Sequence, residues 1–170
     1  MAAVQTNNID YHPEEVDLEF VIKSLINEFE FDAKNQGLKL SFTKETEKVK
    51  ILSDEYIISE IFQNLINNAI KYTKTGGVEI KLFNNGKNKL SVSVKDTGIG
   101  ISKEYLPKLF QAFTQEETGY SRSFEGNGLG LALVKNYVDL IEAEINVDTE
   151  KDKGSEFTVT FDLAKNYHRK

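Results

Sequence analysis

The sequence contains no cysteine and no tryptophan, and it has only two prolines and one methionine in 170 residues. Without cysteine the chain can form neither disulfides nor thiolate metal sites, which is compatible with a reducing compartment. No apolar run approaches the roughly 20 residues of a membrane-spanning helix. Residues 1–8 also lack the basic start and apolar core of a signal peptide. We therefore expect a cytoplasmic module without a membrane segment, whose parent protein can still be membrane-anchored.

The chain also lacks an excess of positive charge. Acidic residues outnumber Lys and Arg by 27 to 21, and the basic residues are scattered instead of forming a stripe. Nucleic-acid binding is therefore not expected. The length and the 39% hydrophobic content predict one domain. We place this domain at residues 14–163, after a lead-in or linker at 1–13 and before a polar tail at 164–170.

Hydrophobic periodicity predicts both helices and strands. The helices expected are residues 16–36, ended by Gly37; a helix capped by Ser53 or Asp54 and ending before Gly76; a short helix at 102–113; and a helix at 129–141. Alternating segments predict strands at 38–43, 49–52, 78–83, 89–95, 143–149 and 155–163. This order predicts a two-layer α/β sandwich, with three helices on one face of a mixed, mostly antiparallel sheet.

Two glycine clusters point to a nucleotide site. The first is Asp96-Thr97-Gly98-Ile99-Gly100, after a predicted strand, and the second is Gly126-Asn127-Gly128-Leu129-Gly130, which opens into an apolar helical pattern. Glycine lets backbone amides approach a bulky anion, and a helix N-terminus favours phosphate. The segment between them, residues 114–125, is polar and has little periodicity, so we expect a loop there.

Polar residues also interrupt one face of the second long helix. Asn64, Asn68 and Lys71 stand at positions i, i+4 and i+7, and therefore share a side of the helix. An Asn oxygen is a neutral hard ligand suited to Mg²⁺, and Lys can meet a phosphate as a point charge. Taken alone, the same residues also fit ordinary roles, with Asn68 and Lys71 facing solvent and Asn64 capping a neighbouring element.

Together these segments resemble the ATP-binding catalytic domain of sensor histidine kinases, a Bergerat-type fold shared with DNA gyrase and the mismatch-repair ATPases. Residues 64–73 are similar to the N box of that family, and residues 96–101 to its G1 box. Its F box and G2 box correspond to residues 109–115 and 126–133, and its closing strand resembles residues 154–161. The resemblance covers residues 14–163, and four ordered motifs are far more specific than one glycine pattern.

The resemblance implies ATP and Mg²⁺ as ligands. Asp96 corresponds to the residue that reads the adenine amine, and Asn68 to the metal ligand. Phe110 and Phe113 correspond to anchors of a lid over residues 114–125, from which Arg122 would reach the γ-phosphate. Asn64, Lys71 and Arg122 are the expected catalytic residues. The other expected nucleotide contacts are Tyr72, Gly98, Ile99, Gly100, Ile101, Gly126, Gly128, Leu129, Gly130 and Leu131.

Position 64 favours phosphoryl transfer over hydrolysis. The gyrase-like hydrolases carry a glutamate base there, whereas the amide of Asn64 cannot accept a proton. In the family the acceptor is a histidine on a separate dimerisation domain, which then serves a response regulator. His12 and His168 lack an acidic, helical acceptor context. We therefore expect a catalytic fragment that lacks its acceptor and is monomeric when isolated.

Other classes fit the sequence less well. An aspartic protease reading of Asp96-Thr97-Gly98 requires a second such motif or a homodimer. A Rossmann reading of the second glycine cluster lacks a preceding strand and the final Gly or Ala, and no Walker A motif is present. Two alternatives stay open: a regulatory module that senses ATP without transferring phosphate, and a protein-serine kinase of the same fold.

Overall fold

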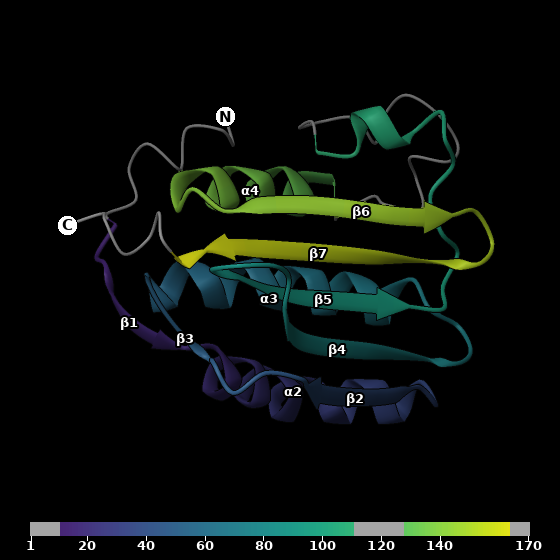
Figure 1. Cartoon of the computed structure of the whole chain (residues 1–170). Helices are drawn as coiled ribbons and strands as arrows, with labels where there is room; N and C mark the ends of the chain where they lie inside the picture. The colour runs from purple at the N-terminus through teal and green to yellow at the C-terminus, as the bar shows by residue number, and fades with distance from the viewer. Residues whose placement is uncertain (1–10, 111–127, 164–170) are drawn as a thin grey trace.

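The computed structural model describes residues 11–110 and 128–163. Three helices lie side by side on one face of a five-stranded sheet (Figure 1): α2 (Leu18–Asn35), α3 (Glu55–Lys71) and α4 (Gly128–Leu140). The sheet has the order β2-β4-β5-β7-β6, with bounds Lys39–Lys44, Gly77–Asn84, Lys89–Asp96, Gly154–Asp162 and Glu144–Glu150. β2 pairs with β4 in parallel, and the other three pairings are antiparallel. The expected two-layer architecture is confirmed.

A second, two-stranded sheet was not predicted. β1 (Glu14–Asp17) pairs antiparallel with β3 (Lys50–Ser53), with Val16 opposite Ile51. The prediction of a helix from residue 16 is therefore wrong at its start. Val16 fits the helical spacing of the apolar residues that follow it, but it is buried through its pairing with a distant strand. The predicted strand at 49–52 does form, outside the main sheet.

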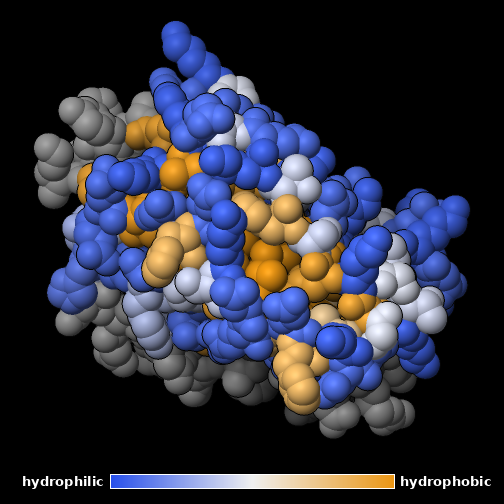
Figure 2. Space-filling model, turned by 90° about the horizontal axis from the view of Figure 1, so that it is seen from below, coloured by the Kyte–Doolittle hydropathy of each residue, from blue (hydrophilic) through white to orange (hydrophobic). Residues whose placement is uncertain are grey.

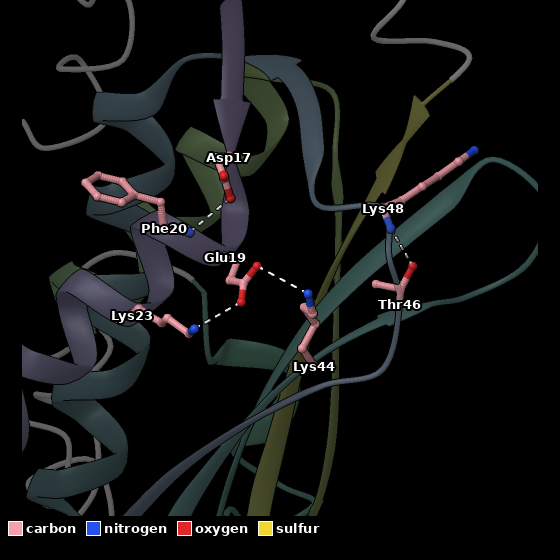
Figure 3. Close-up of polar contacts among 7 residues, drawn as sticks. All are labelled: Asp17, Glu19, Phe20, Lys23, Lys44, Thr46 and Lys48. Atoms are coloured by element: carbon pink, nitrogen blue, oxygen red, sulfur yellow. Dashed lines mark hydrogen bonds and ion pairs between the residues drawn. The ribbon is translucent and has the colours of Figure 1, made fainter.

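The start of α2 is fixed by polar contacts. The Asp17 carboxylate accepts a hydrogen bond of 3.0 Å from the Phe20 N–H, which makes Asp17 the N-cap (Figure 3). In the first turn of the helix, the Glu19 carboxylate contacts Lys23 at 3.0 Å and Lys44 of β2 at 3.5 Å (Figure 3). The Lys23 hydrogen bond is the main cause that lowers the pKa of Glu19. These contacts join the helix to the edge strand of the sheet.

α3 is the central helix of the helical layer. Asp54 is its N-cap, as expected, and accepts a hydrogen bond from the Ile57 N–H at 3.2 Å. The helix ends at Lys71 with Tyr72 as C-cap, well before Gly76. Its aliphatic residues and Phe62 are buried, and they pack against the apolar face of the sheet. Because α3 packs between α2 and α4 and against the sheet, the backbone of its C-terminal half is fixed relative to the end of β5.

The predicted short helix at 102–113 forms only a 3₁₀ turn, η1 (Leu106–Lys108), within the described part of the chain, which stops at 110 there.

The outer face of α2 carries exposed apolar residues: Phe20 and Phe31 are 62% and 69% exposed. Figure 2 shows apolar side chains reaching the surface of this side of the molecule among mostly polar ones. No helix in the described ranges is long and apolar enough to cross a membrane.

Candidate functional site

A pocket lies where the C-terminal half of α3 meets the end of β5, the start of β7 and helix α4. Among the residues that line it are Asn68, Tyr72, Asp96, Ile99, Gly100, Ile101 and Leu131, which the sequence had marked as site residues. The structure thus brings together part of the N box, the G1 box and one residue of the G2 box. Four further lining residues are Leu65, Ala69, Ser155 and Phe157.

Asp96 is the last residue of β5, and its carboxylate is held by two backbone donors. Its Oδ1 accepts hydrogen bonds from the Gly98 N–H at 2.8 Å and the Ser155 N–H at 3.3 Å. Burial raises the pKa of this carboxyl above its ordinary value, and the two hydrogen bonds oppose that shift. Among the described residues no hydrogen bond to Oδ2 is recorded. The carboxylate is therefore oriented through one oxygen and can accept a donor through the other.

The loop after Asp96 is crowded by backbone on both sides. A Cβ on Gly98 would overlap the carbonyl oxygen of Tyr72, and a Cβ on Gly100 would overlap that of Glu150. Gly100 also has a φ of +70°, a conformation that side-chain-bearing residues rarely adopt. These two glycines let the loop lie between the end of α3 and the β6–β7 turn. Their role in the structure is close packing against protein backbone.

Asn68 supplies a polar group without a partner inside the pocket. The residue is 9% exposed, and its Nδ2 is buried with no hydrogen-bond partner within residues 11–110 and 128–163. A buried, unsatisfied amide costs free energy unless a ligand completes it. Rotation of the amide by 180° puts Oδ1 at the same place, where it can coordinate a hard cation. Asn68 therefore fits a metal or water ligand, whereas no cluster of His, Asp and Glu in the described ranges could hold a metal.

Tyr72 connects the end of α3 to the glycine loop, and Thr73 closes the end of the helix. The Ile99 N–H donates to the Tyr72 carbonyl at 3.2 Å, and the Thr73 hydroxyl donates to the Ala69 carbonyl at 2.6 Å. On the opposite wall, the ring of Phe110 packs edge-to-face on Phe157, with centroids 6.4 Å apart. The pocket walls are thus mainly apolar, and its polar side chains are those of Asn68, Tyr72, Asp96 and Ser155.

Three expected site residues do not line this pocket. Asn64 is half-buried, and its Nδ2 donates to the Glu60 carbonyl at 2.7 Å. Lys71 is exposed, with its Nζ 5.9 Å from the centroid of the Tyr72 ring. Gly98 contributes its N–H to Asp96 and is not among the lining residues. The roles predicted for Asn64 and Lys71 stay predictions.

The remaining expected residues lie at the start of α4 or outside the described ranges. Gly128, Leu129 and Gly130 form the first turn of α4, which agrees with a helix that begins in the second glycine cluster. Phe113, Arg122, Gly126 and the segment 114–125 fall outside the residues that the structure describes. The predicted lid and its contacts therefore stay predictions.

The sequence analysis missed four residues of the pocket. Leu65 and Ala69 precede Asn68 and Tyr72 by three residues each, so they share the polar face of α3, and helical spacing alone could have found them. Ser155 and Phe157 lie in β7, and no local signal marks them as neighbours of Asp96. Their place depends on the antiparallel register that sets Asp96 opposite Ser155.

Comparison with known proteins assigns this chain to a family. Residues 53–165 match the family model described as "Histidine kinase-, DNA gyrase B-, and HSP90-like ATPase". The chain belongs to this family of ATPases.

Its relatives narrow the assignment to the histidine kinases. The chain is 35% identical over 159 residues to the autoinducer 2 sensor kinase/phosphatase LuxQ of Vibrio harveyi, covering 90% of the chain and 18% of LuxQ. It is 38% identical over 115 residues to the sensor histidine kinase RcsC of Escherichia coli, covering 68% of the chain and 12% of RcsC. The chain thus spans less than a fifth of these relatives.

Solved structures agree with the relatives. Full-length ShkA in complex with AMPPNP matches with a TM-score of 0.82 and 25% identity, over 94% of this chain and 33% of ShkA. The catalytic domain of histidine kinase ThkA, in a nucleotide-free form, matches with a TM-score of 0.76 and 24% identity, over 89% of this chain and 98% of that domain. The chain is a histidine kinase-type ATPase catalytic domain.

Proposed function

We propose that this domain binds Mg-ATP in the pocket between α3, α4, β5 and β7, and transfers the γ-phosphoryl group to a histidine on a separate dimerisation domain. The observation that carries the proposal is the half-buried Asp96 carboxylate, oriented by two N–H groups through Oδ1. Support also comes from the family match and from ShkA, which was solved with AMPPNP.

Asp96 would recognise the adenine base. A carboxylate accepts a hydrogen bond from the exocyclic amine of adenine, whereas guanine presents a carbonyl oxygen at that place and would be repelled. The apolar side chains of Ile99, Ile101 and Leu131 line the same pocket and offer surfaces for the flat base. The pocket should therefore favour ATP over GTP.

Asn68 would hold the metal ion. Its Nδ2 is buried and has no hydrogen-bond partner among the described residues, so a ligand there would relieve an unsatisfied polar group. Mg²⁺ commonly takes one or two protein oxygens together with phosphate and water, and it supplies charge stabilisation for phosphoryl transfer. The first turn of α4 would add backbone N–H groups for the triphosphate.

The amide at position 64 favours phosphoryl transfer over hydrolysis. The Asn64 amide cannot accept a proton, and its Nδ2 already donates to the Glu60 carbonyl. A water molecule beside it would find no general base at this position. We therefore propose that the nucleophile is a histidine outside this chain. The relatives, of which the chain spans 18% or less, leave room for an acceptor domain elsewhere in the protein. We propose that the acceptor histidine then serves a response regulator.

Calorimetry with Mg-ATP and Mg-GTP tests the site. We expect the wild type to bind Mg-ATP more tightly than Mg-GTP, and Asp96→Asn to lose at least about tenfold in ATP affinity, the effect of one charge-assisted hydrogen bond. The control is Asp148→Asn, the same change at an exposed position on the outer face of β6. Undiminished ATP binding by Asp96→Asn would rule out the assignment of the base site.

Radiolabelled ATP tests the transfer step. We expect label to appear on a histidine-bearing dimerisation domain only when the catalytic domain is also present. The product should be acid-labile and stable in base, as expected of phosphohistidine and not of phosphoserine. ATP binding without transfer to any acceptor would instead support a regulatory module, and acid-stable label would support a serine kinase.

A further inference from the structure

The hairpin between β6 and β7 is in contact with the glycine loop that follows Asp96. The Asp152 N–H donates to the Ile99 carbonyl at 2.6 Å, and the carbonyl of Glu150 lies where a Cβ on Gly100 would fall. On the next strand, a Cβ on Gly154 would overlap the carbonyl oxygen of Asp96. The hairpin therefore packs directly against the loop, and these backbone contacts restrain the position of the loop.

One side chain connects the two segments. The hydroxyl of Thr149 accepts a hydrogen bond from the Ile101 N–H at 3.0 Å, and Ile101 lines the pocket. The same hydroxyl lies 3.0 Å from the Gly154 carbonyl, to which it can donate, and 2.7 Å from the Ser155 hydroxyl. Thr149 itself does not line the pocket. It thus joins the far end of the glycine loop to the two residues at the start of β7.

Ser155 completes the connection to the base site. Its backbone N–H donates to Oδ1 of Asp96, and its hydroxyl lies beside that of Thr149. Asp96 stands at one end of the loop and Ile101 at the other, so Thr149 and Ser155 hold both ends against the same hairpin. A change in the distance between the ends would move the carboxylate relative to the apolar walls of the pocket.

We propose that Thr149 is a positioning residue of the nucleotide site, which sets the adenine pocket by holding the Ile101 N–H and Ser155 together. This inference rests on the proposed function, because it assigns Thr149 to the same ATP site. Removal of the hydroxyl leaves the Ile101 N–H without its acceptor and frees the loop to relax away from the hairpin. Among the described residues, Thr149 makes no hydrogen bond to α4, where the triphosphate would bind.

The test compares Thr149→Val, which keeps the shape and removes the hydroxyl, with Thr149→Ser, which keeps the hydroxyl. Calorimetry below the unfolding transition should give about three- to tenfold weaker Mg-ATP binding for Thr149→Val and near wild-type binding for Thr149→Ser. Thr158→Val is the matched control, because Thr158 lies on the outer face of neighbouring β7 and outside the pocket. Its ATP affinity should not change.

Two further measurements separate positioning from general stability. Hydrogen exchange of the Ile101 amide should speed up in Thr149→Val and stay slow in Thr149→Ser and Thr158→Val. In transfer to an added dimerisation domain, the KM for ATP should rise in Thr149→Val with little change in kcat. Should Thr149→Val not fold, Thr149→Ala serves the same comparison.

The outcomes are distinct. An unchanged ATP dissociation constant in folded Thr149→Val would overturn the inference and leave the proposed function standing. Equal loss in Thr149→Val and Thr149→Ser would also overturn it, because packing and not the hydroxyl would then be responsible. No ATP binding by the wild type would overturn the proposed function, and this inference with it.

Discussion

At the scale of single residues, Gly100 and Gly37 separate two costs of adding a side chain. Both have a left-handed backbone, with φ of +70° and +72°, but only Gly100 has protein backbone where a Cβ would stand. We expect Gly37→Ala to lower the free energy of unfolding by about 1 kcal/mol, the cost of the backbone conformation alone. Gly100→Ala should cost about 1–3 kcal/mol more, because the Glu150 carbonyl must move.

Chemical denaturation of the two variants measures this difference. Gly100→Ala should also weaken ATP binding, whereas Gly37→Ala should not, since Gly37 follows the C-terminus of α2 and does not line the pocket. Equal losses in the free energy of unfolding would mean that the loop can move away from the hairpin without a loss of stability. The close approach of loop and hairpin would then not restrain the site.

The raised pKa of Asp96 predicts how the stability of the fold depends on pH. Because burial raises its pKa above the ordinary value of 3.8, the folded protein binds this proton more tightly than the unfolded chain does. Stability from this group is therefore fully present below about pH 3.8 and is lost as the pH rises through the raised pKa. Asp96→Asn should remove this loss and be as stable as the wild type or more stable at pH 7, while binding ATP worse.

Urea unfolding of both proteins across this pH range, without nucleotide, checks the sign. The wild type should lose stability relative to Asp96→Asn as the pH rises from about 3.8 through the raised pKa. A variant that is clearly less stable than the wild type at pH 7 would show that the two backbone hydrogen bonds outweigh the cost of burial.

At the scale of elements, the two helix caps differ in what they hold. Asp17 caps α2 by accepting from the Phe20 N–H, whereas Asp54 is buried and accepts from both Ile57 and His12 N–H groups, the latter at 2.8 Å. We expect Asp17→Ala to cost about 1 kcal/mol and Asp54→Ala about 2 kcal/mol or more, because the second leaves two donors without an acceptor. Thermal or urea unfolding of the two variants measures the difference, and equal costs would contradict it.

Elements with a local signal were predictable, and those defined by distant pairing were not. The Asp54 cap and the periodic apolar face of α3 were sufficient to place that helix. β1 was missed because four residues carry too little pattern, and their burial depends on β3, more than 30 residues away. Ser155 was missed as a site residue for the same reason, since only the β5–β7 register sets it beside Asp96. Asn68 was predictable because its amide interrupts the apolar pattern of α3 within a motif that can be recognised locally.

At the scale of the whole molecule, the position of His12 bears on self-phosphorylation. Its backbone N–H is bound to Asp54 at the start of α3, whereas the pocket lies around Asn68 and Tyr72 at the end of that helix. Asn68 follows Asp54 by 14 residues, so the two ends of α3 are about 21 Å apart along its axis. In-line transfer needs the acceptor within a few ångströms of the γ-phosphate. His12 therefore cannot receive the phosphoryl group from its own pocket while the fold is intact.

The isolated chain should accordingly remain unlabelled with γ-labelled ATP under conditions in which it binds Mg-ATP. His12→Gln and His168→Gln variants should behave like the wild type, because neither histidine is expected to be the acceptor. Adding a histidine-bearing dimerisation domain should give label on that domain at a rate unchanged by either variant. Label on the isolated wild type that disappears in His12→Gln would contradict this prediction. Since transfer within one folded copy is excluded by the length of α3, such label would have to come from a second copy, with a rate that rises with protein concentration.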